Sequence, residues 1–259
     1  MTEQDVARRL RAAGSVFAEE EATLLVEAAR DPADLESMLE RRVAGEPLEV
    51  VVGWAELCGV RVAVEAGVFV PRARTAVLVE EGVRGLRPGS VVVDLCCGTG
   101  AVGAVIASRV EGVELYASDV DPVAVRCARR NVEPLGGTVL AGDLLDALPT
   151  TLRGRVDLLV VNAPYVPTDA IALMPPEARD HEPRVALDGG ADGVELHRRV
   201  AASAGKWLAP EGRLVVETSE RQAVLTAAAF RAGGLVPRTV RAEHVDGTAV
   251  VGRRRVGAA

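Results

Sequence analysis

The chain has 259 residues, a net charge of −7 and 49% hydrophobic residues, but only 3% aromatic residues. This length allows one large domain with or without a small one, and the Val-, Leu- and Ala-rich apolar content is typical of a parallel sheet covered by helices. The acidic balance argues against a nucleic-acid partner, and no run reaches the roughly 18 apolar residues of a membrane span.

The four cysteines are expected to be free thiols. Cys58, Cys96, Cys97 and Cys127 match no zinc-binding spacing, and the adjacent Cys96 and Cys97 are a poor disulfide pair. We therefore expect reduced side chains in a reducing cytosol and no metal site. The polar, acidic residues 1–5 are unlike a signal peptide, so a cytoplasmic location is predicted.

The first part of the chain is predicted to contain short helices and then short strands. Residues 1–47 hold apolar side chains at helical spacing, interrupted by Asp31-Pro32 and by Gly45-Glu46-Pro47. Residues 48–74 change to short β-like runs at 50–52 and 60–64, which predicts a hairpin-like linker.

From residue 75 onward the predicted elements alternate between helix and strand. Strands are expected at 91–93, 114–117, 138–141, 158–161, 213–217, 239–242 and 248–252, and helices at 75–86, 101–109, 122–131, 197–208 and 221–232. This alternation predicts an α/β fold with a doubly wound, mostly parallel sheet and an antiparallel closing strand. A long loop, about 165–193, separates the fourth strand from the next helix, and loops of this length are commonly functional.

A glycine-rich loop follows the first strand of this region and leads into a helix. Its sequence is Asp94-Leu95-Cys96-Cys97-Gly98-Thr99-Gly100, and Gly103 completes a G-x-G-x-x-G spacing, which by itself is a weak dinucleotide signal. Asp94 lies where a pyrophosphate would sit, and like charges there are unfavourable. The same carboxylate suits a cationic ligand such as S-adenosylmethionine, directly or through water.

Acidic residues also end the next two strands. Asp119 can take two ribose hydroxyls of a nucleoside ligand, whereas Asp121 is better placed to cap the following helix. Asp143 ends the third strand, where an adenine ring would lie between a polar contact and the apolar side chain of Leu144. A plain turn at Gly142 is nearly as compatible with the spacing.

The segment Asn162-Ala163-Pro164-Tyr165 directly follows the apolar run 156–161, so it is expected at the end of a buried strand. It offers an amide side chain, backbone carbonyls and an aromatic ring, and Pro164 stiffens the turn. Such a loop can hold a planar –NH2 group. Without further information, a turn-forming Asn and a Tyr that anchors the loop explain the segment equally well.

With these motifs in this order, the chain resembles class I S-adenosylmethionine-dependent methyltransferases, and more narrowly the protein-(glutamine-N5) methyltransferase family. The family pattern is also matched at residues 41–48, 67–72, 181–183 and 186–193 and at Glu217 and Gln222. The chain departs from it at three places: Ala163 replaces a proline, Cys96-Cys97 replaces Gly and a small residue, and Arg74 replaces an acid. A short N-terminal part is a further difference, and together these indicate a divergent paralogue.

The resemblance implies a domain division and a set of site residues. Residues 1–47 correspond to a helical substrate-recognition region, 48–74 to a linker and 75–259 to a Rossmann-like methyltransferase domain. The cofactor S-adenosylmethionine is expected to contact Asp94, Cys96, Cys97, Gly98, Thr99, Gly100, Asp119, Val120, Gly142, Asp143, Leu144 and Asn162. Catalysis and substrate binding are assigned to Asn162, Ala163, Pro164 and Tyr165. Arg72 is a candidate for the methionyl carboxylate or the substrate, with a surface salt bridge as an equal alternative.

The implied reaction is methyl transfer from S-adenosylmethionine to the side-chain amide nitrogen of a glutamine in a protein, a peptide-chain release factor being one candidate. The Asn162 side-chain oxygen and the Ala163 carbonyl would accept hydrogen bonds from the –NH2 group, and Tyr165 would pack against the amide. No general base is evident, and His181 is a weaker candidate than a structural His. No membrane or direct nucleic-acid partner is expected.

Four alternatives stay open at this point. The acceptor could be a small-molecule amine, amidine or amide, which the short N-terminal part and Ala163 allow. An adenine-N6 methyltransferase would hold a planar –NH2 group in the same way, but the acidic net charge of the chain argues against a nucleic-acid substrate. A dinucleotide-dependent oxidoreductase would bind NAD(P) instead of S-adenosylmethionine. If the protein is a non-catalytic binding module, Asn162→Ala should leave its cofactor affinity and its biological effect unchanged.

Overall fold

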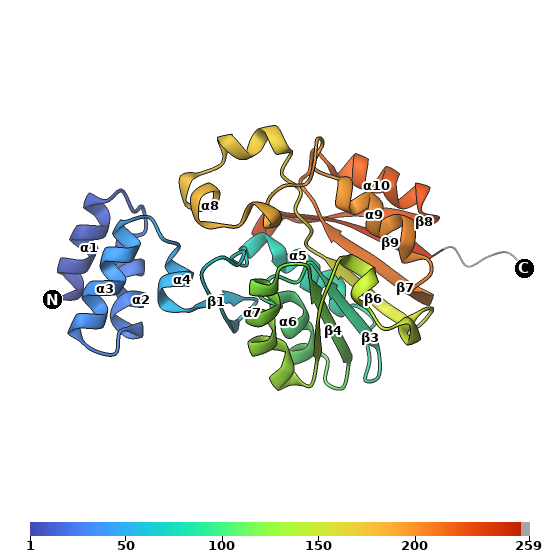
Figure 1. Cartoon of the computed structure of the whole chain (residues 1–259), viewed down its shortest axis with the longest axis horizontal. Coiled ribbons are helices and arrows are strands. Elements are labelled where there is room, and N and C mark those ends of the chain that lie inside the picture. The colour runs from blue at the N-terminus through green and yellow to red at the C-terminus, as the bar shows by residue number, and fades with distance from the viewer. Residues whose placement is uncertain (255–259) are drawn as a thin grey trace, which may run out of the picture.

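The computed structural model describes residues 1–254 and begins with a bundle of three helices, which stands apart from the rest of the molecule at the left of Figure 1. The helices are Glu3–Ala12 (α1), Ala18–Ala28 (α2) and Pro32–Val43 (α3). Thr2 and Asp5 form a capping box on α1, and Asp31 accepts hydrogen bonds from two backbone N–H groups of α3. The apolar faces of the helices meet in a small core around Leu10, Leu25 and Leu39. The helices expected in residues 1–47 are therefore confirmed.

A short helix and a hairpin connect the bundle to the rest of the chain: Leu48–Val52 (α4), Trp54–Leu57 (β1) and Val60–Ala63 (β2). The two strands pair antiparallel, which confirms the strand expected near residue 60. The strand expected at 50–52 is wrong, because these residues belong to α4. A short β-branched run has no clear period, and here Val51 packs into the core of the bundle before Gly53, with φ +83°, ends the helix.

The main body contains a seven-stranded sheet in the order β5-β4-β3-β6-β7-β9-β8. Its strands are Val91–Leu95 (β3), Glu114–Asp119 (β4), Thr138–Ala141 (β5), Val156–Val161 (β6), Leu208–Glu217 (β7), Leu235–Ala242 (β8) and Gly247–Arg254 (β9). The first five of these run parallel, and β9 pairs antiparallel with both β7 and β8. This confirms a doubly wound, mostly parallel sheet. The chain moves from β3 outward to β5 and then returns beside β3 as β6, so the strand order switches between β3 and β6.

Helices cover both faces of this sheet, as Figure 1 shows. They are Ala76–Val83 (α5), Ala101–Arg109 (α6), Pro122–Val132 (α7), Glu195–Ala204 (α9) and Ala223–Ala232 (α10). Alternate strand residues face opposite layers: Val92 and Val160 pack with α5, α6 and α7, whereas Val93 and Val161 pack with α9 and α10. Both faces of the sheet are thus buried, which agrees with the continuous apolar runs of the strands.

The segment between β6 and α9 contains short helical turns, Thr168–Leu173 (η5) and Arg184–Ala186 (η6), on either side of a six-residue helix, Pro176–His181 (α8). Figure 1 places α8 between the bundle and the sheet. The segment therefore lies over the ends of the strands, where the sheet reverses its order. Within residues 1–254, no helix is long and apolar enough to cross a membrane. The predicted methyltransferase domain ends at residues 255–259, which lie outside the described residues.

Candidate active site

A cavity of about 830 Å³ opens at the carboxyl ends of β3, β4, β5 and β6. Its walls come from the loops that follow these strands, from residues 67–69, 71, 74 and 75, from the segment between β6 and α9, and from the start of α9. Six carboxylate residues and three arginines line it, so its charge is negative if all are ionised. Crevices at a switch in strand order are where doubly wound sheets bind ligands, and a negative wall favours a cationic one.

The glycine loop between β3 and α6 forms one wall of this cavity. The backbone N–H of Gly98 donates to Asp119 Oδ2 at 2.9 Å, so the acid at the end of β4 fixes the loop. Gly100 has φ +74°, and a Cβ atom there would lie 2.7 Å from Val132 Cγ2. A side chain at Gly100 would therefore separate the loop from α7, while Gly98 has open space beside it.

Asp94 lies beneath the glycine loop and is almost completely buried at the end of β3. Its Oδ2 accepts a hydrogen bond from the backbone N–H of Gly103 at 2.9 Å. Burial raises the pKa of Asp94 to about 7, and nearby Asp119 adds to the rise, although the Gly103 hydrogen bond opposes it. A cation in the cavity would favour the ionised form of this carboxyl.

Asp119 and Asp121 make different contacts, and Asp121 is the helix cap that its position suggested. Asp121 caps α7 through Val123 N, and its own N–H donates to Asp119 Oδ1 at 3.0 Å. Burial also raises the pKa of Asp119. At the end of β5, Asp143 pairs with Arg199 of α9 at 2.5 Å, and both residues line the cavity together with Leu144. These strand ends offer carboxylate oxygens beside an apolar surface, as a nucleoside needs.

All four cysteines, each among the described residues, are free. Cys96 and Cys97 lie in the cavity wall, where burial raises the pKa of both thiols well above the usual value. Both thiols therefore stay protonated near neutral pH, which makes them poor nucleophiles.

The segment 162–165 enters the cavity at the end of β6 and is held from several sides. Gln222 Nε2 donates to the backbone oxygen of Tyr165 at 2.7 Å, and Asn162 Nδ2 lies 3.4 Å from Thr75 Oγ1. The Asn162 side-chain oxygen accepts no hydrogen bond from the residues that the structure describes. This oxygen and the carbonyl of buried Ala163 are thus the acceptors that the segment can offer to a ligand.

The hydroxyl of Tyr165 belongs to a polar cluster around the buried carboxylate of Glu217 at the end of β7. It donates to Glu217 Oε1 at 3.1 Å and accepts from Arg74 Nε at 2.9 Å. Burial raises the pKa of Tyr165 far above its usual value. Burial also raises the pKa of Glu217, although Thr75 and Arg74 lower it in part. Tyr165 is therefore a neutral phenol, fixed in place rather than poised to ionise.

The cavity brings together nearly all residues that the sequence suggested. Two of them lie elsewhere: Gly100 faces α7, and Arg72 pairs with Glu182 at 2.5 Å. This is a salt bridge to a buried carboxylate rather than the surface salt bridge that was the alternative. His181 is exposed and outside the cavity wall. His197 is buried against Thr226, and burial lowers its pKa to about 4.

Among the wall residues that sequence reasoning missed as site residues are Arg74, Thr75 and Arg199. Arg74 was noted only as a departure from a family pattern. Thr75 belongs to no recognisable motif, and Arg199 is one of three charged residues on an amphipathic helix. A glycine loop, an acid at the end of the next strand and an amide-bearing loop after β6, arranged around one negative cavity, define a class I S-adenosylmethionine-dependent methyltransferase.

Comparison with known proteins agrees with this class. The family model "Methyltransferase small domain" matches residues 60–174. Release factor glutamine methyltransferases of Geobacter sulfurreducens and Mycolicibacterium smegmatis are 36% and 37% identical, over 72% and 78% of this chain and 65% and 72% of the relatives. A 4-amino-L-phenylalanine/4-methylamino-L-phenylalanine methyltransferase of Streptomyces pristinaespiralis is 36% identical over 76% of this chain and 69% of the relative. The chain therefore belongs to the methyltransferase family that contains the release factor glutamine methyltransferases.

The matched region spans 65% to 72% of the length of these relatives. Among solved structures, a methyltransferase of Pyrococcus furiosus has a TM-score of 0.57 at 15% identity, covering 76% of this chain and 90% of that chain. At this level of identity the likeness shows the fold alone.

Proposed function

We propose that this protein transfers a methyl group from S-adenosylmethionine to the side-chain amide nitrogen of a glutamine in a protein, with a peptide-chain release factor as the candidate acceptor. The observation that carries the proposal is the position of the Asn162–Tyr165 segment. Its free acceptor groups share one cavity with the glycine loop and Asp119. The names of the relatives from Geobacter sulfurreducens and Mycolicibacterium smegmatis support the choice of acceptor.

The residues of the cavity fit S-adenosylmethionine. Asp119 would take the ribose hydroxyls, Asp143 and Leu144 would border the adenine, and Asp94 would offset the positive charge. The contribution of Cys96, Cys97, Thr99 and Val120 would be shape, since they complete the same wall. When bound, S-adenosylmethionine supplies an electrophilic methyl group on a sulfonium.

The protein's part in the reaction is to position a weak nucleophile. The Asn162 side-chain oxygen and the Ala163 carbonyl accept hydrogen bonds from the –NH2 group and favour the positive charge that grows on nitrogen. Pro164 stiffens the turn, and Tyr165 packs against the acceptor amide from its fixed position. The proton lost from nitrogen passes to water.

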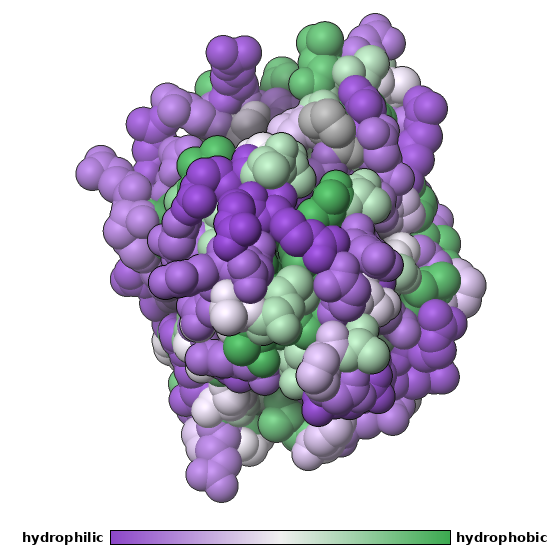
Figure 2. Space-filling view, turned by 90° about the vertical axis from the view of Figure 1, so that its left-hand side faces the viewer, coloured by the Kyte–Doolittle hydropathy of each residue, from purple (hydrophilic) through white to green (hydrophobic). Residues whose placement is uncertain are grey.

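The helical bundle is the proposed recognition region for a protein acceptor. It stands outside the cavity and faces the viewer in Figure 2, where apolar groups are interspersed among hydrophilic ones. Val16 and Phe17, between α1 and α2, are 84% and 65% exposed, which is unusual for a Phe. The division into residues 1–47, 48–74 and 75–259 rests on this proposal, and the cytoplasmic location also remains a prediction.

A small-molecule amine is the second candidate acceptor. It is favoured by the relative of Streptomyces pristinaespiralis, whose name gives it an amino acid with an aromatic amine as substrate. An aromatic amine also presents a planar –NH2 group, which the Asn162 and Ala163 acceptors would hold in the same way.

To test the proposal, the purified protein is incubated with S-adenosylmethionine and a peptide-chain release factor, and peptide mass spectrometry locates any added methyl group. We expect one methyl group on a glutamine. Asn162→Ala should lower the rate about 100-fold or more while S-adenosylmethionine still binds, because a positioned acceptor is lost. If the wild-type protein binds S-adenosylmethionine but adds no methyl group to any glutamine, the proposed acceptor is wrong.

A further inference from the structure

Arg74 presents unused hydrogen-bond donors in the acceptor end of the cavity. It belongs to a short helical turn, Ala73–Thr75 (η1), and its Nε–H is shared between Tyr165 Oη at 2.9 Å and Glu217 Oε1 at 3.4 Å. The Nη1 and Nη2 groups make no hydrogen bond to any residue of 1–254. The Arg74 side chain is 46% exposed and lines the cavity, so these groups are accessible to a ligand.

The guanidinium is held in a fixed place beside the proposed acceptor groups. Its ion-pair partner Glu217 lies at the end of β7 and is 2% exposed. Its other partner, Tyr165, belongs to the segment 162–165 that carries the acceptor groups. Thr75 follows Arg74 in the chain, and its Oγ1 lies 3.4 Å from Asn162 Nδ2. Donors from Arg74 and acceptors from Asn162 and Ala163 thus line the same cavity and are linked through shared neighbours.

We propose that Arg74 forms the oxygen-binding half of the acceptor subsite and donates a hydrogen bond to the carbonyl oxygen of a carboxamide. Asn162 and Ala163 hold the –NH2 half of the same group. The inference rests on the proposed function and deepens it, because it makes the carboxamide, rather than any planar –NH2 group, the unit that is recognised. An aromatic or aliphatic amine has no oxygen at this position and leaves the guanidinium unpaired.

The charges around Arg74 favour a neutral oxygen over a carboxylate. Glu217 already offsets the charge of Arg74, and Glu182 is offset by Arg72. Glu182 Oε2 and Glu217 Oε2 are buried without a hydrogen-bond partner among the described residues, so an added anion would face both carboxylates. A carbonyl oxygen gains the hydrogen bond without this repulsion, which distinguishes it from the methionyl carboxylate of S-adenosylmethionine.

A donor at the carbonyl oxygen also helps to orient the reacting nitrogen. Two-ended binding fixes the plane of the amide, and withdrawal of electrons toward oxygen makes the N–H groups more acidic. Their hydrogen bonds to Asn162 and Ala163 become stronger as a result. In the transfer the S–CH3 bond breaks, the N–CH3 bond forms and one N–H proton leaves to water, while Arg74 keeps its protons throughout.

The test compares the wild-type protein with Arg74→Gln and Arg74→Lys on a glutamine-bearing peptide and on 4-aminophenylalanine, with S-adenosylmethionine affinity measured separately by calorimetry. We expect Arg74→Gln to lower kcat/KM for the peptide about 10- to 100-fold, because a charge-assisted hydrogen bond is lost. The Kd for S-adenosylmethionine should change less than about twofold. Arg74→Lys should recover part of the activity, and added guanidinium should restore part of it in Arg74→Ala.

Arg155→Gln is the matched control. Arg155 is similarly exposed (54%) and lies 3.3 Å from Glu114, which starts β4 at the opposite end of the sheet from the cavity. The kcat/KM of Arg155→Gln for the glutamine-bearing peptide should equal that of the wild-type protein.

Each contrary outcome is distinguishable. A parallel rise in the Kd for S-adenosylmethionine would place Arg74 at the cofactor and overturn the inference. Unchanged peptide kinetics in Arg74→Gln would overturn the inference alone and leave the proposed function standing. A wild-type protein that methylates 4-aminophenylalanine but no carboxamide would overturn both. A wild-type protein that methylates only a non-protein carboxamide, with the Arg74 effect present, would overturn the proposed acceptor and support the subsite.

Discussion

The carboxyl group of Asp94 is almost fully buried and also lines the ligand cavity. Burial raises its pKa from 3.8 to about 7, so the folded protein binds a proton there that the unfolded chain releases. Between about pH 4 and pH 7 the folded state holds more protons, and the contribution of Asp94 to stability therefore decreases as the pH rises. A bound cation would relieve the cost of ionising this group.

We therefore predict that S-adenosylmethionine binding depends on the protonation of Asp94. As the pH falls from 8 to 6, Asp94 takes up a proton, and the Kd should rise about threefold to tenfold because the attraction to the sulfonium is lost. Asp94→Asn should bind more weakly at pH 8 and show little pH dependence, as measured by calorimetry at both pH values. An unchanged pH dependence in Asp94→Asn would assign the effect to another group, such as Asp119.

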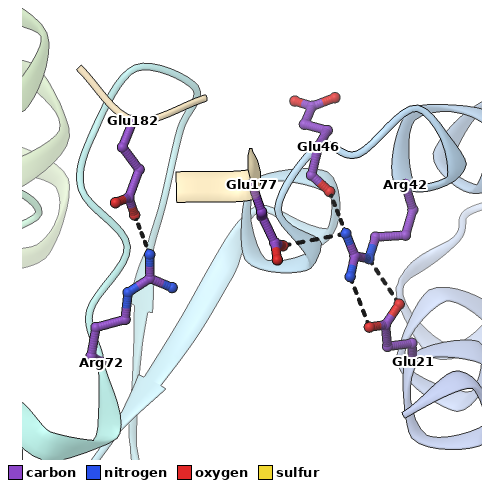
Figure 3. A network of polar contacts seen from close by, with 6 residues as sticks. All are labelled: Glu21, Arg42, Glu46, Arg72, Glu177 and Glu182. Atoms are coloured by element: carbon purple, nitrogen blue, oxygen red, sulfur yellow. Dashed lines mark hydrogen bonds and ion pairs between the residues drawn. The ribbon is translucent and has the colours of Figure 1, made fainter. Parts of the chain in front are cut away.

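At the scale of elements, polar contacts hold α8 near both of its ends, as Figure 3 shows. At one end Arg42 of α3 binds both carboxylate oxygens of Glu21 at 2.8 and 2.9 Å and also reaches Glu177 of α8 at 3.3 Å. After its other end, Glu182 accepts from the backbone N–H of Val70 and from Arg72. The segment that covers the cavity is thus connected both to the helical bundle and to the linker beside the cavity.

We predict that Arg42→Ala destabilises the bundle. Arg42 and Glu21 are 15% and 10% exposed, so the substitution leaves a nearly buried carboxylate without its partner and should cost about 2–4 kcal/mol of unfolding free energy. Urea denaturation followed by circular dichroism measures this cost. Arg30→Ala is the control, because Arg30 is 84% exposed in its pair with Asp34 and its loss should change stability little. Equal effects of the two substitutions would show that the Arg42 pair contributes no more than a surface pair.

At the scale of the whole molecule, the hydrophobic core is divided. One cluster belongs to residues of the bundle and α4, whereas two larger clusters fill the two sides of the sheet. Because the bundle has its own small core, its local stability should depend on few side chains, and it can open without the sheet.

We predict that Leu25→Ala opens the bundle alone. Leu25 is 0% exposed in the bundle core, and its truncation should cost about 2–5 kcal/mol there. Hydrogen exchange with mass spectrometry should show faster exchange in residues 3–43 and unchanged exchange in β3 and β6, with S-adenosylmethionine affinity retained. Faster exchange throughout the sheet would instead indicate one cooperative unit.

The sequence by itself determined the sheet, most helices and the residues of the cavity wall near the strand ends. Helical spacing and apolar runs are local signals, and the carboxyl ends of parallel strands must meet at one edge. The glycine loop, Asp119, Asp143 and Asn162 were therefore expected to converge. The strand predicted at 50–52 was wrong, because the packing of Val51 into the bundle, and not the local β preference of the run, makes it a helix.

Only the tertiary structure decided which side chains act together within the site. Arg74 meets Glu217 across 143 positions, and Arg72 meets Glu182 across 110. The sequence suggested Arg72 equally as a ligand contact and as a partner in a surface salt bridge. In the fold Arg72 is engaged by Glu182, and Arg74 lines the cavity instead. Such pairings have no periodic signal, because they depend on how distant loops pack around the strand ends rather than on the pattern within any one segment.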